Sequence, residues 1–588
     1  MKSTASYFSV SPPLIKENLR RYWAIPAISF LVYFLSGIFP ILISYGELDT
    51  RYFFIGSMLQ NHHPIFMMAH LFVPVITSVV VFRYLQTGAS VTMLHSMPFT
   101  RAGLFNSSVL SGLILAVSPM LLTGVILLLI SKPVIGFYAQ NIPYLQVGLN
   151  EGANVFARAD IANWMWESFI IILFIYMIAT FAGILSGNSL MHIFAGFGFN
   201  FLVPALFGIF TLYCRQYLYG FALSNEWEAI VAGLSPYLLV FRNGGGFPIA
   251  LQAIYIAVAF ALFAVSMLLY YNRKFERTSD SFVFNFMIPV VSYLIAFFGM
   301  SLLGFYFDAI GNGGNFHYVG LLSGAVIFLL IGRMIAKKTF RIFDKRTAQS
   351  LGLYLMIAAV FVFSFTLDLT GYEKRVPAES RINGVIISNH ISLSPGRELY
   401  PEIDTTLSSS ENIALFREFH KSIIENHGDI AEASRYSYYA WTNLHYDMKG
   451  IWDMSRLYSL DYEFLKDSKE LARIFESDEY KSKNGLLNID LSGLDSINIR
   501  HPLDYTGRSV LILSNHRIRE LLERIDADFK LQTYESALSF QNPYAEVSFT
   551  FTHPGPDSNM QYVRLIRIPR DYKNTIQWLS NNGYAEQI

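Results

Sequence analysis

Nine long apolar stretches fill the first 369 residues of the chain, and residues 370–588 have the mixed polar pattern of a water-soluble protein. A helix needs about 20 apolar residues to cross the hydrocarbon core of a bilayer, and each stretch has roughly that length. We therefore predict an α-helical polytopic membrane domain with about nine spans. The predicted spans are Tyr22–Tyr45, Ile65–Tyr84, Val109–Ile130, Trp166–Leu185, Met191–Leu212, Ala250–Tyr271, Phe286–Phe305, Val319–Ile335 and Gly352–Leu369.

The positive charges between the predicted spans indicate their orientation, because Lys and Arg are enriched in short cytoplasmic segments. With a cytoplasmic N-terminus, the inner segments hold 15 Lys and Arg residues. The outer loops then hold five, namely Arg51, Lys132, Arg158, Arg215 and Arg242. We therefore expect a multi-pass protein of the cell membrane with a cytoplasmic N-terminus. An odd number of spans then places the C-terminal domain outside the cytoplasm.

Residues 370–588 are expected to fold as a soluble α+β domain. Arg435–Tyr446 and Trp452–Leu460 are rich in β-formers, and the turn Asp447–Gly450 between them favours a hairpin. Further strands are predicted at Ile497–Ile499, Ser509–Ser514, Ala545–Thr552 and Met560–Ile568, and helices at Tyr462–Ser477, Arg517–Lys530 and Thr575–Asn581.

One more helix is predicted after Ser408, because Ser408 and Glu411 have the spacing of a capping box. Along it, apolar residues and two histidines share one helical face: Ile413, Phe416, His420, Ile423 and His427. The two histidines are two turns apart and have no evident third partner, so a core or surface role is favoured over a metal site.

Composition and charge narrow the function classes. Hydrophobic residues make up 53% of the chain and charged residues only 15%, against about 25% in average soluble domains. The formal net charge is zero, but residues 1–369 carry a net +7 and residues 370–588 a net −7. An acidic soluble domain gives no support for nucleic-acid binding. The single cysteine, Cys214, excludes an internal disulfide and is expected to be an inert small side chain.

Residue types that carry chemistry are scattered. No Ser or Cys stands in a nucleophile elbow, and Asn61-His62-His63 is too small a set for a metal site. The chain has no Gly-rich loop ending in Gly-Lys-Ser/Thr, which ATP hydrolysis needs, and Leu491–Asp495 is interpreted as a turn. We therefore predict that the chain is not an enzyme and binds no metal or cofactor of its own.

The loop between the second and third predicted spans carries the sharpest motif. It can form a short helix, and Pro98 favours a turn or a helix start because proline has a fixed φ and no N–H. Met93, Leu94, Met97 and Phe99 offer an apolar tip, and Arg101 adds a charge. Such a tip suits docking into a groove of a partner protein. An ordinary connecting loop that rests on the membrane is the alternative.

Leu94-His-Ser-Met-Pro-Phe-Thr-Arg101 resembles the "LxSLPxTR" element of ABC-2 type permeases, the membrane subunits of ATP-binding-cassette transporters. In that family the element follows the second span and forms the coupling helix that meets the ATPase subunit. The resemblance therefore implies an ATPase-coupling loop made by Leu94, His95, Ser96, Met97, Pro98, Phe99, Thr100 and Arg101. His95 is unusual in the motif, and Asn106 stands where a basic residue is common.

Three further traits are similar to the family. Pro12–Arg21 can form an interfacial amphipathic helix, although a solvated leader is the alternative. Glu228–Phe241 is apolar but too short to cross, like the family's re-entrant helices. Arg273-Lys-Phe-Glu-Arg277 looks like the basic tail of Gram-positive relatives. The resemblance divides the chain into a six-span ABC-2-like unit (residues 1–275), three further spans (276–369) and an extracytoplasmic α+β domain (370–588), as in some Firmicute permeases.

The resemblance implies a permease subunit that moves a substrate across the cytoplasmic membrane. The substrate could be a peptide, an antibiotic or a lipid-like molecule, and a separate cytoplasmic ATPase would bind and hydrolyse the ATP. The chain would pair with itself or with a sister permease. The basic loop Arg333–Arg346 can contact anionic membrane lipids, but its charges are sufficiently explained by fixing the topology of the spans, which is the preferred interpretation. The main alternative is a sensor or immunity component that binds an extracellular ligand and signals without transport. A membrane-anchored enzyme and an ion-driven transporter are disfavoured, because catalytic clusters and charges within the spans are scarce.

Overall fold

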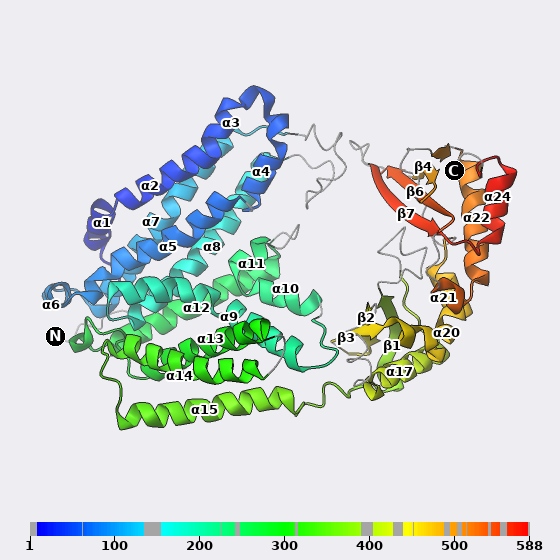
Figure 1. Cartoon of the computed structure of the whole chain (residues 1–588). Coiled ribbons are helices and arrows are strands. Elements are labelled where there is room, and N and C mark those ends of the chain that lie inside the picture. The colour runs from blue at the N-terminus through cyan, green and yellow to red at the C-terminus, as the bar shows by residue number, and fades with distance from the viewer. Residues whose placement is uncertain are drawn as a thin grey trace. The chain divides into compact units, whose positions relative to one another are not determined.

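The computed structural model of the chain contains long helices followed by a region with two small sheets (Figure 1). It divides into two compact units, one made largely of residues up to Phe210 and Glu228–Phe363, and one made of Thr211–Trp227 and the chain from Ser364 onward. The structure describes residues 9–585 except 62, 135–154, 224, 242–246, 312–314, 390–403, 427–438, 451, 487–493, 503–508, 513, 539–542 and 553–560.

Within these described residues, nine helical segments are long and apolar enough to cross a membrane, which confirms the predicted number of such helices. Each of the nine overlaps one predicted span. In chain order they are α2 to α3 (Ala24–Ile43, with the π-helical turn η1, Phe34–Ile38), the segment Phe54–Gln86 (α4, Tyr52–Leu59; α5, Pro64–Val81; η3, Phe82–Gln86), α7 (Arg101–Ile130), α8 (Arg158–Leu185), α9 (Ser189–Tyr217), α12 (Ile249–Asn272), α13 (Met287–Ile310), α14 (Phe316–Lys337) and α15 (Lys345–Thr366).

Several of these helices begin well before the apolar stretch that predicts them, and α7 and α8 show why. Helix α7 starts at Arg101 because the Thr100 hydroxyl caps it, accepting a hydrogen bond from the Gly103 N–H at 3.0 Å. Helix α8 starts at Arg158, where the Asp160 carboxylate accepts from the Ala157 N–H at 2.9 Å. Capping groups, rather than apolarity, therefore decide where these helices start.

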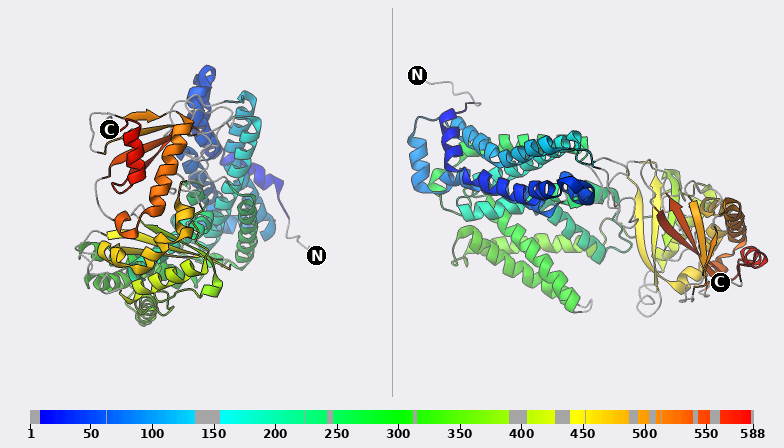
Figure 2. Two further views of the ribbon diagram at one scale, coloured as in Figure 1. Left: turned by 90° about the vertical axis from the view of Figure 1, so that its right-hand side faces the viewer. Right: turned by 90° about the horizontal axis from the view of Figure 1, so that it is seen from above.

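Short helices accompany the long ones. Helix α1 (Pro12–Arg21) confirms the predicted helix before the first span, and the Asn18 amide donates to the Ser111 hydroxyl of α7 at 2.9 Å. Glu228–Phe241 is covered by α10 (Asn225–Gly233) and α11 (Pro236–Phe241), both too short to cross a bilayer. Helices α1 and α6 (Gly88–Ser96) lie at the same end of the long helices (Figures 1 and 2).

Helices α13 and α14 form a close antiparallel pair that depends on glycine. A Cβ added to Gly324 would lie 2.8 Å from the Gly299 carbonyl oxygen, and one added to Gly299 would overlap the Phe328 ring. Small residues let two apolar helices approach closely and gain dispersion contacts. This packing supports helix α14, which contains Val319–Ile335, the shortest of the predicted spans.

The C-terminal unit holds two antiparallel sheets. The first has the order β1-β2-β3, from β1 (Ile382–Asn389), β2 (Tyr439–Met448) and β3 (Met454–Asp461). The second has the order β5-β4-β6-β7, from β4 (Leu494–Arg500), β5 (Val510–Ile512), β6 (Ala545–Thr552) and β7 (Gln561–Ile568). The hairpin β2–β3 pairs Tyr446 with Met454 across the predicted turn, which confirms that part of the α+β prediction.

Each sheet buries one face against helices. Alternate residues of β2 point inward, such as Leu444 and Tyr446, and meet Phe416 and Phe419 of α17 (Ser410–Glu425). Helices α22 (Asn515–Leu531) and α24 (Lys573–Asn581) cover the second sheet (Figure 1). The buried side chains of both sheets and these helices form one continuous apolar core.

Several local predictions for this unit are wrong. The predicted helix Tyr462–Ser477 breaks into α19 (Tyr462–Asp467) and α20 (Lys469–Glu476), because the Ser468 hydroxyl accepts from the Leu471 N–H and starts a new helix. The cap of α17 is Ser409, not Ser408, and its hydroxyl accepts from the Asn412 N–H. Leu494 and Asp495, read as part of a turn, begin β4, and residues 491–493 lie outside the described residues.

Candidate coupling site

The predicted coupling loop contains a helix followed by an extended link. Leu94, His95 and Ser96 close α6, whereas Met97, Pro98, Phe99 and Thr100 run to α7, which starts at Arg101. The Phe99 N–H donates to the Met97 carbonyl at 2.7 Å, so Pro98 lies in a tight turn as predicted. All eight residues therefore belong to one continuous surface segment.

Helix α6 buries little of itself. Val91 is its one buried side chain, whereas Met93 exposes 59% of its surface. Leu94, Met97 and Phe99 are half-buried, so the apolar tip expected from the sequence is held partly against the protein. An exposed methionine at the end of a short helix is a surface feature that fits a protein groove.

Two residues of the motif contact the segment that follows the sixth apolar helix. The centre of the His95 ring lies 4.2 Å from the centre of the Phe275 ring, which belongs to η5 (Phe275–Arg277). The Arg101 guanidinium lies 5.0 Å from the same ring and donates to the Tyr271 carbonyl at 2.7 Å. Burial and the nearby Arg101 charge lower the pKa of His95. His95 is therefore neutral at pH 7 and packs as an aromatic ring.

The base of the loop is tied to the start of α9. The Gln86 amide N–H donates to His192 Nδ1 at 2.8 Å, and the Gln86 amide oxygen accepts from the Ser189 hydroxyl at 2.7 Å. Since Nδ1 accepts, the proton lies on His192 Nε2, which donates to the Ala179 carbonyl at 2.8 Å. Gln86 therefore links the loop to both α9 and α8.

Arg273 also holds the base of the loop, by linking Leu85 to the C-terminal end of α8. Its guanidinium is 3% exposed and donates to the carbonyls of Leu85, Gly183, Ile184 and Ser186, at distances of 2.5–3.2 Å. Three of these carbonyls lie at the C-terminal end of α8, where backbone acceptors lack helical partners and a positive charge is favoured. Burial lowers the pKa of Arg273 to about 10, so the side chain stays charged at pH 7.

The segment before α1 also contacts the motif. The Ser9 and Thr100 hydroxyls lie 2.9 Å apart, and the Asn106 amide donates to the Ser9 carbonyl at 3.1 Å. Asn106, which departs from the basic residue common in the family, therefore positions the chain just before α1. Sequence reasoning missed this contact, because a short N-terminal segment shows no pattern that identifies its partner.

A second polar junction lies within the C-terminal unit. The backbone of Phe221 pairs with that of Arg456 on β3, and the Leu457 N–H donates to the Gly220 carbonyl at 3.2 Å. Gly220 has a φ of +73°, and a Cβ there would overlap the Tyr458 ring, so this close approach needs glycine. The turn that follows α9 is thus built into the edge of the first sheet.

Arg456 completes this junction. It is 2% exposed, its guanidinium lies 3.6 Å from the centre of the Tyr372 ring, and it donates to the Tyr372 carbonyl at 2.8 Å. Tyr372 follows α15 by six residues, and the neighbouring Glu373 accepts from the Tyr219 N–H at 2.8 Å. Three chain segments far apart in sequence therefore meet at one buried cation.

His420 lies inside the same unit. Its Nδ1 is 2.7 Å from the Tyr446 hydroxyl and its Nε2 is 2.9 Å from the Tyr458 hydroxyl. Burial, reinforced by the Arg456 charge, lowers the pKa of His420 to about 3. The neutral ring donates to one tyrosine and accepts from the other. His427 lies outside the described residues, so the predicted shared face is seen here only as far as Ile423.

Within the part of the chain that the structure describes, no three His, Cys, Asp or Glu side chains gather closely enough to hold a metal ion. Of Asn61-His62-His63, residue 62 lies outside that part, Asn61 accepts from the Ser168 hydroxyl, and His63 packs against Phe54 and Phe66. Cys214 is buried in α9. No protein-family model, no curated protein and no solved structure matches this chain.

Proposed function

We propose that this chain is the membrane subunit of an ATP-powered transporter of the ABC-2 type. A separate cytoplasmic ATPase would dock on α6 and the link Met97–Thr100. The chain would work as a homodimer or with a sister permease. The observation that carries the proposal is the coupling loop itself, a short helix with an exposed Met93 beside half-buried apolar residues, whose base is anchored to the long helices.

The anchoring of the base supports a coupling role over that of a plain connection. A loop that only joins two spans needs no buried partners at its base. Here Gln86 is 4% exposed and bonded to α9, and Leu85 is bonded through Arg273 to the end of α8. A push or pull on α6 would therefore be carried into α8 and α9 instead of being absorbed by the loop.

Helix α9 gives this movement a path to the C-terminal unit. It begins at Ser189, whose hydroxyl donates to the Gln86 amide oxygen. Its last turns, from Thr211 onward, belong to the C-terminal unit. The turn after it carries Gly220 and Phe221, which are built into β3. On the orientation that the positive charges favour, the C-terminal unit lies outside the cytoplasm. ATP-driven movement of α9 would then reach the turn that carries Gly220 and Phe221.

Co-purification tests the proposal. The full-length chain, tagged and expressed in its native host, is extracted in mild detergent, and its partners are identified by mass spectrometry. We expect an ATP-binding protein with a Gly-rich phosphate loop to co-purify. The Met93→Asp variant should recover at least about tenfold less of it, because a charge placed in an apolar groove must be desolvated.

Leu531→Asp is the matched control, because Leu531 is also an exposed apolar residue, at 76%, but lies in the C-terminal unit. This variant should recover the ATPase normally. Arg101→Gln should weaken recovery less than Met93→Asp, since it loosens the contact with Tyr271 without charging the tip. Absence of any ATPase in the wild-type sample, or equal recovery by the Met93 and Leu531 variants, would refute the proposal.

A further inference from the structure

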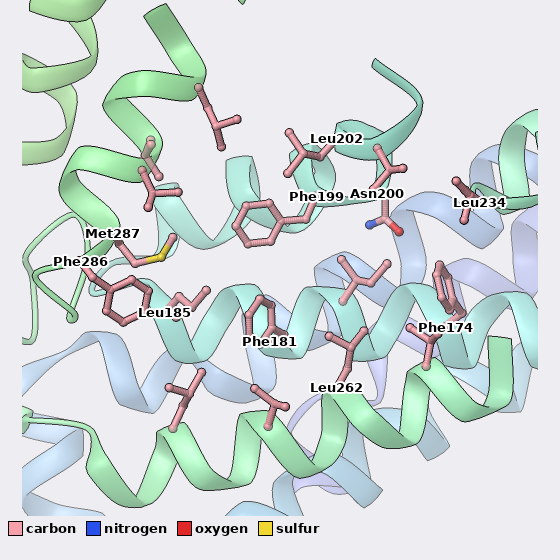
Figure 3. Close-up of a pocket in the computed structure, with 18 residues that line it drawn as sticks. Phe174, Phe181, Leu185, Phe199, Asn200, Leu202, Leu234, Leu262, Phe286 and Met287 are labelled. Carbon is pink, nitrogen blue, oxygen red and sulfur yellow. The ribbon is translucent and has the colours of Figure 1, made fainter. Parts of the chain in front are cut away.

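The helical unit contains an apolar cavity of about 620 Å³ that the coupling site does not use (Figure 3). It lies between α8, α9, α12 and α13. Of its 18 lining residues, 17 are apolar, and the one polar member is Asn200. Val203, Val258 and Val290 line it and expose 48%, 39% and 45% of their surface, so the cavity opens sideways at the helix surface.

The cavity has two distinct ends. Figure 3 shows Leu185, Phe286 and Met287 at one end and Asn200 and Phe174 at the other. Along α12 the lining residues run from Val258 to Leu269, eleven residues or about 16 Å of helix. This length is about half of the 30 Å hydrocarbon core of a bilayer. The cavity is therefore long enough to span one leaflet, and its Asn200 end, near the middle of α9, is called its deep end.

Asn200 places a hydrogen-bond acceptor at the deep end of the cavity. Its amide N–H donates to the Gly196 carbonyl at 2.7 Å, which fixes the amide so that the side-chain oxygen faces away from its own helix turn. Asn200 is 3% exposed, and among the described residues its Oδ1 has no hydrogen-bond partner. A buried acceptor without a donor is unfavourable, so this oxygen selects for a ligand that brings one.

The lining also restricts what that ligand can be. It contains no Lys, Arg, Asp, Glu or His, so a charged group at the deep end would be buried without a partner. Its volume of about 620 Å³ falls within the range of small-molecule sites.

We propose that this cavity binds an uncharged amphiphile, with an extended hydrocarbon body and a hydroxyl or amide N–H that donates to Asn200 Oδ1. The hydrocarbon would lie along α8 and α12 within one leaflet, and the donor would sit near the bilayer midplane. Binding of this kind requires neither ATP nor a partner subunit, so the site stands apart from the coupling role of α6.

Photolabelling of the full-length chain in lipid nanodiscs, without ATP or any partner, tests the site. The probes are a long-chain primary alcohol with a diazirine close to the hydroxyl and its methyl ether, which has the same body but no donor. We expect the alcohol to label peptides that contain Phe199–Val203 roughly five- to tenfold more than the ether, the preference given by about one hydrogen bond. The Asn200→Leu variant should label equally with both probes.

Asn272→Leu is the matched control, because Asn272 makes the same bond to the carbonyl four residues earlier but is exposed at the end of α12. It should keep the preference for the alcohol. Leu262→Trp, which narrows the cavity, should reduce labelling by both probes. Equal labelling of the wild type by alcohol and ether, a preference that survives Asn200→Leu, or no label on the cavity peptides would overturn the proposal.

Discussion

Two buried arginines, Arg273 in the helical unit and Arg456 in the C-terminal unit, hold their surroundings in different ways. Both are at most 3% exposed, and within the described residues neither forms an ion pair with a carboxylate. Arg273 donates to four backbone carbonyls and replaces the hydration of a helix end. Arg456 donates to Tyr372, rests on its ring and makes a weaker bond to its own neighbour Ser455.

The two guanidinium groups therefore stabilise their surroundings through different interactions. At the end of α8 the backbone acceptors are already in place, and the cation satisfies them through hydrogen bonds. At β3 three separate segments must be held together, and the guanidinium does so largely through its flat apolar face. We therefore expect loss of Arg273 to unfold local structure and loss of Arg456 to separate segments that remain folded.

The largest effect is expected for Arg273→Met. Methionine fills similar space but leaves four buried carbonyls without a donor, which should lower the free energy of unfolding by about 3–5 kcal/mol. Thermal unfolding in detergent, followed by size-exclusion chromatography, measures the loss. Arg83→Met is the control, because Arg83 is exposed and should tolerate the change. Equal stability of the two variants would mean that the Arg273 bonds contribute nothing net.

Arg456→Met should lower the free energy of unfolding by about 2–4 kcal/mol, less than Arg273→Met. The methionine keeps apolar contact with the Tyr372 ring, and fewer carbonyls lose a donor. Hydrogen exchange should rise at Tyr219–Phe221 and Tyr372 while β2 and β3 stay protected. The partly exposed Arg500 provides a control as Arg500→Met. Increased exchange across the whole first sheet would instead show that Arg456 supports the sheet and not the junction.

The contrast between the two arginines also explains what the sequence could predict. The apolar helices and the hairpin β2–β3 were predictable because their patterns are local, and strand β6 has the predicted bounds Ala545–Thr552. Arg273 looked like one more cytoplasmic charge, since its acceptors come from residues 85 and 183–186. Strand β1 was missed because its partner lies about sixty residues away, with Ile382 opposite Met448.

The candidate site was predictable in its position but not in its supports. The motif Leu94–Arg101 is recognisable as a run of residues, and the tight turn at Pro98 follows from proline chemistry. The anchors Gln86 and His192 lie outside any motif, and their roles depend on which side-chain atoms meet in space. His95 was noted as unusual, yet the ring of Phe275 that explains it lies 180 residues later.

A third prediction concerns His420, which tests whether the C-terminal unit also depends on a neutral buried ring. Its pKa is lowered to about 3 in the folded state, below the usual 6.5, so the unfolded state binds the proton first as pH falls. Stability should therefore decrease between pH 6.5 and 3, with a slope of up to about 1.4 kcal/mol per pH unit. The His420→Leu variant should lose about 1–3 kcal/mol at pH 7, because two tyrosine hydroxyls lose their partner.

The free energy of unfolding of His420→Leu should fall less steeply than that of the wild type as the pH decreases. The difference in stability between the two proteins should therefore become smaller toward pH 4. Urea unfolding followed by circular dichroism at pH 4, 5, 6 and 7 measures both quantities. Tyr446→Phe provides the control, because it removes one hydrogen bond but keeps the titrating ring and should keep the slope. Parallel curves for wild type and His420→Leu would show that His420 does not titrate in this window.

The smallest effect is expected at the edge of the junction, where Trp227 and Trp452 stack with ring centres 5.0 Å apart and planes 13° from parallel. Both rings are about half exposed, so the pair should contribute about 0.5–1.5 kcal/mol beyond the two separate side chains. A double-mutant cycle with Trp227→Leu, Trp452→Leu and the double variant isolates this coupling. If Arg456 alone holds the turn after α9 against β3, the coupling will be near zero. A coupling of about 1 kcal/mol that disappears in Arg456→Met would instead show that the guanidinium positions the stack, and that the junction acts as one unit.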